Sequence, residues 1–555
     1  MMYKKGLLAL NGLMLVVMTS CGVSKSLHDT PNVNSFNSQI PERQKIADTF
    51  LIAGANRLLK NQQGLWELSV AGNPYQLGLV SGSLTKELFE KQEEALLGKV
   101  EEMVPSKFKQ YMLRKILAWY NRKMYLHVPE EYKSEILGLS KYAGDTYDYV
   151  ADDYLRILYL HGAHDIGHAF QDLALVGCSS FAAWGENTED GNLVIGRNFD
   201  FYAGDEFSEN KIIAFVQPTN GYKFMSVTWA GMIGVVSGMN EKGLTVTINA
   251  GKSKVPMEAK TPISIVTREI LQYASTIEEA IAIAKKREVF VSESIFVGSA
   301  ADNRAVTIEV SPENFGVYEV PNSEELICSN HFQSEAYVHD EDNLKHIAES
   351  HSMYRYQRME ELLNEVPKLS PQAAVDILRN KEGLKDELIG YGNEKSLNQL
   401  LAHHGIVFQP SKRLVWVSAP PYQLGAFVAY DLDEVFGGNS EKGRSLQNEA
   451  LIIESDEFLF TEAYANYENY RVLSRRLTEA IQNDMHLGPE LLFEFEKSNP
   501  DYWETYYMLG QYYYKKKYYT AAQNAFGKAL TKEISTVPYK QDIQHYLKKI
   551  KRQLQ

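Results

Sequence analysis

The spacing of apolar residues predicts helices in the N-terminal third of the chain. Apolar positions recur at helical intervals in four segments: Gln44–Gln62, Leu84–Val104, Phe108–Tyr120 and Glu130–Tyr142. The step Gly72-Asn73-Pro74-Tyr75 between the first two is typical of a turn. We therefore predict that residues 43–177 form a mostly helical segment.

From about residue 178 the pattern changes to alternating and β-branched runs, which predict strands. These runs are Asn192–Ile195, Ile212–Gln217, Phe224–Trp229, Gly243–Asn249 and Arg304–Val310. Helices are predicted at Pro262–Tyr273 and at Ile277–Lys286, with Thr276 as the N-cap of the second. Further helices at 341–365 and 371–379 precede a strand pair at 405–408 and 413–418. Residues 178–430 thus read as an α+β domain, a sheet-rich core covered by helices.

Residues 455–555 are predicted to be helical and are rich in aromatic side chains. Seven residues fit the spacing of a tetratricopeptide repeat: Tyr506, Leu509, Gly510, Tyr513, Ala522, Phe526 and Ala529. Since one isolated repeat is marginally stable, we expect it to pack against neighbouring helices. A repeat of this kind also predicts a surface for a protein partner.

The first residues resemble a bacterial lipoprotein signal. Lys4 and Lys5 precede a short apolar run that ends at Cys21, and the run is too short to span a bilayer comfortably. We predict that residues 1–20 are a signal peptide, that Cys21 is lipidated, and that residues 21–42 are a flexible tether. The protein would then be exported and anchored to a membrane, in the periplasm or at the cell surface. The alternative is an ordinary signal peptide with an incidental cysteine.

Length and charge narrow the class of protein further. A chain of 555 residues predicts two or three domains. Its net charge is −14, from 57 basic and 71 acidic residues, and dense basic runs are confined to the extreme C-terminus, so nucleic acid is not an expected partner. No phosphate-binding or dinucleotide-binding motif stands out, and we predict no cofactor.

Three histidines are the candidates for metal binding. His161, His164 and His168 share a helical face, but no HExxH pattern or cysteine ligand accompanies them, so we predict no metal site. His403 and His404 receive no role. The cysteines are Cys21, Cys178 and Cys328. A disulfide between Cys178 and Cys328 remains open, and a lone thiol in an exported protein calls for an explanation.

The strongest candidate for chemistry is Cys178. It follows Gly177 and precedes a predicted hairpin whose second strand ends in Arg197-Asn198-Phe199-Asp200. If the Gly177–Cys178 bond is cut, Cys178 carries both a thiol and a free α-amine, a nucleophile and a base in one residue. Gly177 offers an unhindered acyl group for an N-to-S shift. The hairpin would place Arg197 and Asp200 beside the thiol.

Four further motifs accompany this stretch. All five occur in order over roughly residues 65–420, and together they resemble the motifs of a known enzyme group. The motifs are Gly72–Gly78, Thr247–Gly251, Ser329–Phe332 and Ser352–Arg358. Together they resemble the choloylglycine hydrolase and penicillin acyltransferase group of N-terminal-nucleophile (Ntn) hydrolases. The chain is more similar to the acyltransferase-like branch, in which internal self-cleavage exposes the cysteine.

The resemblance implies a fold and a set of roles. The fold would be a four-layer αββα sandwich, cut into an N-terminal chain and a chain that starts at Cys178. Cys178 would attack the acyl carbon, Asp200 would orient the α-amine, and Arg197 would stabilise the thiolate. Asn249 and Asn330 would hold the oxyanion, and Arg355 would balance charge, with Arg358 as its competitor. The plainer alternatives are a structural cysteine, a hairpin salt bridge and turn asparagines.

The implied reaction is attack on a linear amide of a small N-acyl compound or peptide through a thioester acyl-enzyme. Water as acceptor gives hydrolysis, and an amine gives acyl transfer. Because acyl-CoA is expected to be scarce outside the cytoplasm, hydrolysis is favoured. Two alternatives stay open: a non-catalytic binding protein that uses the C-terminal repeat, and a bile-salt (choloylglycine) hydrolase specifically.

Overall fold

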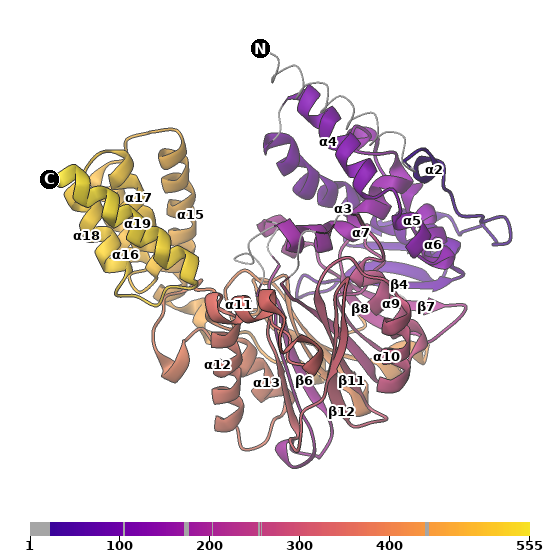
Figure 1. Ribbon diagram of the computed structural model, residues 1–555. Coiled ribbons are helices and arrows are strands. Elements are labelled where there is room, and N and C mark those ends of the chain that lie inside the picture. The colour runs from indigo at the N-terminus through magenta and orange to yellow at the C-terminus, as the bar shows by residue number, and fades with distance from the viewer. Residues whose placement is uncertain are drawn as a thin grey trace.

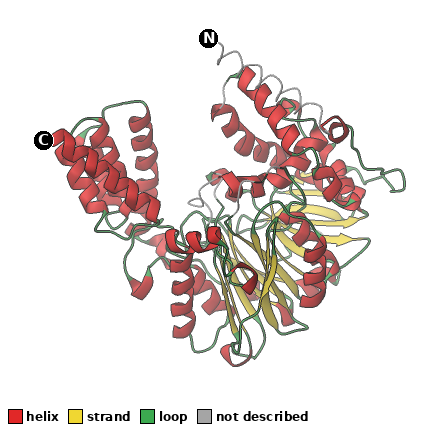
Figure 2. Cartoon of the chain, viewed as in Figure 1, coloured by secondary structure: helices red, strands yellow, loops and turns green. Residues whose placement is uncertain are grey.

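The computed structural model describes residues 23–103, 106–170, 177–201, 204–252, 256, 258–438 and 443–555 (Figure 1). Two β-sheets lie at the centre of the molecule, with helices around them and a separate group of helices at the C-terminus (Figure 2). Residues 1–22 lie outside the described part of the chain, and with them the predicted signal peptide and Cys21. Among the described helices, none combines the length and apolarity needed to cross a bilayer.

The larger sheet has eleven strands. In spatial order they are β1 (Arg43–Ala47), β2 (Phe50–Ala53), β3 (Asn56–Lys60), β4 (Trp66–Gly72), β7 (Ile212–Pro218), β8 (Phe224–Thr228), β9 (Ser237–Asn240), β10 (Leu244–Ala250), β11 (Glu293–Ser299), β12 (Arg304–Val310) and β13 (Phe315–Tyr318). Strand β4 pairs with β7 in parallel, and the other neighbours are antiparallel. The segment before Cys178 therefore supplies four strands of this sheet.

The smaller sheet has six antiparallel strands and carries the hairpin that follows Cys178. In spatial order they are β14 (Glu325–Cys328), β5 (Ser179–Ala183), β6 (Val194–Phe199), β15 (His404–Gln409), β16 (Leu414–Ser418) and β17 (Phe427–Asp431). In the hairpin Ser180 pairs with Arg197 and Ser179 with Asn198. The end of β6 therefore lies beside the start of β5, as expected from the predicted hairpin.

Helices are formed by residues that precede and by residues that follow the Gly177–Cys178 bond in the sequence. The N-terminal segment holds α2 (Val23–Leu27), α3 (Pro74–Met103), α4 (Lys107–Tyr120), α5 (Met124–His127), α6 (Glu130–Ser140) and α7 (Asp153–Phe170). After the bond come α8 (Asp205–Glu209), α9 (Ile263–Tyr273), α10 (Ile277–Lys286), α11 (Glu341–Glu349), α12 (Ser352–Glu365), α13 (Pro371–Leu378) and α14 (Leu432–Phe436). Thr276 caps α10 as predicted, since its side chain accepts a hydrogen bond from the Glu279 amide at 3.3 Å.

Apolar side chains form separate cores on the two faces of each sheet. One core, with Phe215, Phe296 and Ile406, lies where residues of both sheets meet. A second joins the opposite face of the larger sheet to α3, α6, α7, α9 and α10. A third joins the smaller sheet to α12 and α13, with Phe181 and Met359 among its members. The central strands are therefore buried on both faces, and even their polar side chains, such as Thr245 and Thr247 of β10, lie away from solvent.

The prediction of a helix over Gln44–Gln62 is wrong, because this segment forms β1, β2 and β3. Two tight turns interrupt the apparent helical spacing, and Gly54 in the second turn has φ of +64°, which favours glycine. Phe50–Ala53 alternates between half-buried and buried positions, the period of a strand. The other helices predicted before residue 177 are present as α3, α4 and α6.

The prediction of a flexible tether over residues 21–42 also needs correction for the part that the structure describes. Val33 and Ile40 pack against the core of the larger sheet. Asp29 forms an ion pair of 3.1 Å with Lys133, whose side chain is buried. These contacts hold the segment on the surface of the N-terminal helices.

Five helices form the C-terminal group, coloured yellow in Figure 1. They are α15 (Glu462–Gln482), α16 (Pro489–Ser498), α17 (Trp503–Lys515), α18 (Tyr519–Ala529) and α19 (Val537–Leu554). Gly510 allows α17 and α18 to approach, because a Cβ atom there would lie 2.7 Å from the Phe526 ring. The core of this group also includes Leu400, Tyr422 and Leu424, so the helices are packed against the preceding domain.

Candidate active site

Cys178 lies immediately before β5 and is almost completely buried. Its Sγ atom is 3.6 Å from Nη2 of Arg197, which projects from the paired strand β6. The hairpin thus brings a thiol and a guanidinium group together, as predicted. Burial raises the pKa of the Cys178 thiol, and Arg197 opposes this effect.

Arg197 is fixed by contacts on both sides of its guanidinium group. Nη1 donates to the Ser237 hydroxyl at 2.6 Å, and Nη2 donates to the backbone carbonyl of Ile248. The Arg197 Cζ atom lies 4.3 Å from the centre of the Phe199 ring. A cation held this rigidly is suited to stabilise a thiolate without reorganisation.

Asp200 ends the hairpin and is fully buried. Its Oδ1 atom accepts a hydrogen bond of 3.4 Å from Gln423, and its Oδ2 atom has no hydrogen-bond partner among the described residues. Burial raises the pKa of this carboxyl to about 7, although Arg355 and Arg197 act in the opposite direction. The Asp200 backbone carbonyl accepts from the Gly177 amide at 3.3 Å. The carboxyl is therefore tied by the backbone to the Gly177–Cys178 bond.

Arg355, on the first turn of α12, joins two other candidate residues, Cys178 and Asn330, and also contacts Ser179. Nη1 donates to the Cys178 carbonyl at 2.6 Å and to the Ser179 hydroxyl at 2.8 Å, and Nη2 donates to Oδ1 of Asn330 at 2.6 Å. Burial lowers the pKa of Arg355 to about 10. Its competitor Arg358 instead pairs with Glu361 and Asp386. The structure thus places Arg355, and not Arg358, at the thiol-bearing residue.

The two asparagines are engaged with backbone groups. Asn249 donates from Nδ2 to the carbonyls of Cys328 and Ser329, both at 3.2 Å. Asn330 donates from Nδ2 to the Ala250 carbonyl at 2.9 Å. Asn249 uses both amide hydrogens in these bonds, whereas the bonds of Asn330 use one. Their roles as oxyanion donors stay predictions, and Asn330 is the better placed.

The possible disulfide between Cys178 and Cys328 does not form, since both residues are buried free thiols. Cys328 ends β14, the neighbour of β5, where Cys328 pairs with Ser180. Burial raises the pKa of the Cys328 thiol as well. An inert buried thiol beside the candidate nucleophile is consistent with a packing role for Cys328.

Gln399 is a site residue that the sequence did not reveal. It is buried, and its Nε2 atom donates to the Gly177 carbonyl at 3.4 Å. A Cβ atom on Gly177 would lie 2.1 Å from that nitrogen, so only glycine permits the contact. Gln399 lies 222 positions beyond Gly177 in a loop without a motif, and only the fold brings the two together.

Two histidines that received no role lie behind Arg197. His404 shares a 2.9 Å hydrogen bond with Ser237, and His403 contacts His404 at 2.8 Å between ring nitrogens. Burial lowers the pKa of both histidines well below the usual value, so both are neutral. They complete the polar surroundings of the Arg197 guanidinium group without adding charge.

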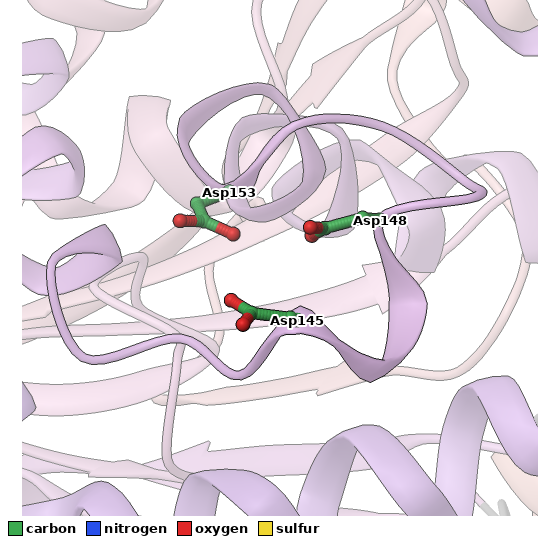
Figure 3. A group of neighbouring side chains, drawn as sticks. All are labelled: Asp145, Asp148 and Asp153. Atoms are coloured by element: carbon green, nitrogen blue, oxygen red, sulfur yellow. The ribbon is translucent and has the colours of Figure 1, made fainter.

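The helical histidine face and an acidic cluster both contain residue types that can bind a metal ion. Both ring nitrogens of His161 are engaged, with Ile157 O at 2.8 Å and Ile233 N at 3.0 Å. The side chains of His164 and His168 lie outside the described part. The three carboxylates of Asp145, Asp148 and Asp153 lie within 4.8 Å of one another (Figure 3). Arg156 pairs with Asp148 at 2.7 Å and with Asp153 at 3.4 Å, which balances their charge.

Comparison with known proteins confirms the resemblance drawn from the motifs. Residues 186–421 match the model of the family described as acyl-coenzyme A:6-aminopenicillanic acid acyl-transferase. The matched region contains Arg197, Asp200, Asn249, Asn330 and Arg355, and it begins after Cys178. The assignment of the nucleophile therefore depends on the geometry described above.

Curated relatives cover part of the chain. An uncharacterized protein of Archaeoglobus fulgidus is 30% identical over 46% of this chain and 45% of its own length. Protein dcd1B of Dictyostelium discoideum is 24% identical over 45% and 51%. The N-acylethanolamine-hydrolyzing acid amidase of Caenorhabditis elegans is 27% identical over 39% and 60%. The chain thus spans about half the length of the relatives it matches.

Two solved structures are similar at lower identity. The Caenorhabditis elegans N-acylethanolamine-hydrolyzing acid amidase ortholog aligns with a TM-score of 0.31 and 18% identity, over 42% of this chain and 93% of that one. A conjugated bile acid hydrolase variant from Clostridium perfringens aligns with a TM-score of 0.32 and 14% identity, over 46% and 92%.

Proposed function

We propose that this protein is a self-processing N-terminal cysteine hydrolase that acts on linear amide bonds of N-acyl compounds. The observation that carries the proposal is the environment of one peptide bond. On its Cys178 side lie the Arg197 and Arg355 guanidinium groups, and on its Gly177 side lies the Gln399 amide. A structural cysteine has no need of two buried cations and a carboxyl group around it.

Self-cleavage would proceed by an N-to-S acyl shift. The Cys178 thiol loses its proton, and Sγ attacks the Gly177 carbonyl carbon, whose oxygen faces Nε2 of Gln399. Collapse breaks the C–N bond, and the departing nitrogen takes up the proton as the new α-amine of Cys178. Water then hydrolyses the thioester and leaves a carboxylate on Gly177. In this scheme the new amine donates to Oδ2 of Asp200, an atom that has no hydrogen-bond partner among the described residues of the uncut chain.

The mature site would use the same atoms on a substrate. The α-amine takes the thiol proton, Sγ attacks the amide carbon, and the protonated amine returns the proton to the leaving nitrogen. Water then cleaves the acyl-enzyme thioester; an amine in place of water would give acyl transfer. The names of the amidase relative and of the matching family support acyl amides as the substrate class.

The proposal also covers the layer arrangement of the sheets, the nature of the C-terminal helices and the location of the protein. The cores on both faces of each sheet support a four-layer αββα arrangement. The close packing of Gly510 on Phe526 supports a tetratricopeptide-like hairpin at α17 and α18. We also propose that Cys21 is lipidated and that the protein is exported and anchored to a membrane; the Gly6 to Cys21 pattern supports this step.

Intact-mass measurement of the purified protein beside Cys178→Ala tests the proposal. We expect two fragments from the natural sequence, the larger starting at Cys178, and one uncut chain from Cys178→Ala. Cys328→Ala is the matched control, since it removes a second buried free thiol, and it should be cut normally. One uncut chain from the natural sequence would reject the mechanism and favour the binding-protein alternative.

A further inference from the structure

A chain of buried hydrogen bonds leads from Arg197 away from the Cys178 thiol. Nη1 of Arg197 donates to the Ser237 hydroxyl at 2.6 Å, and that hydroxyl lies 2.9 Å from Nε2 of His404. Nδ1 of His404 is in turn 2.8 Å from Nδ1 of His403. All four side chains in this chain of bonds are fully buried. The proposed reaction uses Arg197 and leaves the other three without a part.

The hydrogen-bonded chain connects the two sheets behind the thiol. Arg197 on β6 and His404 at the start of β15 belong to the smaller sheet, whereas Ser237 begins β9 of the larger sheet. Nη2 of Arg197 also crosses to the larger sheet, where it donates to the Ile248 carbonyl. Both of these oxygen acceptors belong to the larger sheet, so that sheet fixes where the guanidinium group lies.

The donors and acceptors along the chain of bonds favour one arrangement of hydrogens. An arginine side chain only donates, so the Ser237 oxygen accepts from Arg197 and its own hydrogen is left for Nε2 of His404. A neutral His404 ring that accepts at Nε2 carries its hydrogen on Nδ1 and donates it to His403. The reverse order would leave the Ser237 hydrogen without an acceptor among the described residues. Nε2 of His403 has no hydrogen-bond partner there in either order.

Both histidine rings stay neutral in these surroundings. Burial lowers the pKa of each ring well below its usual value, and the nearby Lys211 and Arg197 lower it further. The Phe199 ring packs on both, with its centre 5.3 Å from that of His404 and 6.1 Å from that of His403. A neutral His404 can accept a hydrogen bond at Nε2, which a protonated ring could not.

His404 matters because a serine hydroxyl can rotate about its C–O bond. A Ser237 hydrogen turned toward Arg197 would face a group that can only donate. His404 prevents this orientation by accepting the hydrogen, and an acceptor on a hydroxyl hydrogen also makes the oxygen a better acceptor. The contact of Nη2 of Arg197 with Sγ of Cys178, at 3.6 Å, is then maintained.

We propose that Ser237 and His404 are positioning residues that keep the Arg197 guanidinium group directed at the Cys178 sulfur. The inference rests on the proposed hydrolase function, in which that sulfur is the nucleophile. His403 acts one step further away, because it accepts from His404 and so holds its tautomer. The two histidines therefore support the thiol chemistry without exchanging a proton with the substrate.

The ultraviolet absorbance of the Cys178 thiolate, measured against pH for the full chain, tests this role. The same chain with Cys178→Ala is the blank, since Cys328 and the tyrosines are common to both and cancel in the difference. We expect Ser237→Ala to raise the midpoint of the Cys178 titration by about one pH unit, because Arg197 is no longer held at the sulfur. Self-cleavage after cell-free synthesis should slow about tenfold, as the thiolate fraction falls by that factor.

His404→Gln and His404→Met form a matched pair, since the two side chains are similar in volume and only glutamine offers an oxygen acceptor to Ser237. His404→Met should shift the midpoint as Ser237→Ala does, and His404→Gln should restore most of the natural value. Ser264→Ala is the control and should cause no shift, because the buried Ser264 hydroxyl has no hydrogen-bond partner among the described residues. Equal shifts in the two His404 variants, or an unshifted midpoint in Ser237→Ala, would overturn the inference.

Imidazole nitrogen chemical shifts of the natural chain test the arrangement of hydrogens without a variant that could misfold. The signals that disappear in His404→Gln identify His404. We expect a neutral ring with its hydrogen on Nδ1 at His404 and on Nε2 at His403. The reverse tautomers, or a charged ring, would overturn the inference. A natural chain that is not cut would reject the proposed function, whereas each outcome named for the inference can arise while the natural chain cuts itself normally.

Discussion

Gly177 and Gln399 show how one pair of residues can prepare a peptide bond for cleavage. The glutamine amide occupies the position where a side chain on residue 177 would project, and it donates to the carbonyl that must become an oxyanion. The distance of 3.4 Å from Gln399 Nε2 to the Gly177 oxygen is long for a hydrogen bond in the uncleaved chain. A donor aimed at the oxygen in its tetrahedral position gains strength as the reaction proceeds.

Gln399→Met should slow self-cleavage about 10- to 100-fold, since it keeps the volume and removes the donor. The time course of fragment appearance, followed by gel or mass after synthesis in a cell-free system, measures the rate. Gln409→Met is the matched control, because Gln409 is also buried but donates to Asp190 on the surface. Equal rates in both variants would remove Gln399 from the mechanism.

Asp200 predicts a pH dependence of stability in the uncut chain. Its pKa is about 7 in the folded protein, raised by burial from 3.8, so the folded state keeps a proton that the unfolded state releases between these values. The contribution of the Asp200 carboxyl to the free energy of unfolding is fully present below about pH 4 and is lost as the pH rises through about 7. The loss amounts to up to about 4 kcal/mol.

Urea unfolding of Cys178→Ala, with and without Asp200→Asn, isolates this contribution. The difference in unfolding free energy between the two chains should fall as the pH rises from about 4.5 to about 7.5. Both chains share all other titrating groups, which cancel in the difference. A difference that stays constant over this range would mean that the Asp200 carboxyl is not protonated in the folded chain.

At the scale of elements, the motif Gly72–Gly78 has a structural explanation in the crossing of two helices. Asn73 directly precedes α3, and its Oδ1 atom accepts a hydrogen bond of 3.0 Å from the Gln76 amide in the first turn of that helix. Gly78 then faces α6, where a Cβ atom would lie 1.9 Å from the backbone oxygen of Glu135. The motif is therefore needed to dock α3 on α6.

Gly78→Ala should destabilise the uncut chain by about 1–3 kcal/mol or more, because neither backbone can move without disturbing the helix packing. The thermal or urea midpoint of the Cys178→Ala background measures the effect. Gly144→Ala is the control, since nothing lies within 4 Å of its Cβ position. Equal midpoints for the two would contradict the packing argument.

Local patterns predicted most elements after residue 178 and the hairpin that joins Cys178 to Arg197 and Asp200. They could do so because strand alternation and a short turn are encoded within about 20 residues. The strands within Gln44–Gln62 could not be predicted, since short strands with tight turns can imitate helical spacing. The contact between Gln399 and Gly177 joins two distant segments, and no local pattern records it.

At the scale of the whole molecule, the C-terminal helices brace the loop that carries Gln399. Leu400, next to it, is buried in the core of those helices, and the Tyr467 hydroxyl donates to its carbonyl at 3.3 Å. Gly390, where the loop begins, has φ of +84° and lies so close to Tyr502 that a Cβ atom would be 2.4 Å from its backbone. The loop is thus held between the scissile bond and the tail.

Leu400→Ala should therefore slow self-cleavage as well as lower stability, because the lost packing loosens the Gln399 side chain. Leu477→Ala, in the same core but on α15, is the matched control. It should cost a similar amount of stability, about 2–5 kcal/mol, and leave the cleavage rate near normal. Equal slowing in both would point to general destabilisation.

This bracing sets an order of events during biosynthesis. The residues that fix the Gln399 loop emerge from the ribosome after Glu462, and Tyr502 is among the last to do so. A nascent chain that ends before Tyr467 and Tyr502 lacks their contacts with the Gln399 loop, even if both sheets have already formed. We expect such a chain to cleave itself slowly. Self-cleavage would then wait until the segment that carries Tyr467 and Tyr502 has been translated and has packed against the loop, so that the reactive terminus is released only after these contacts have formed.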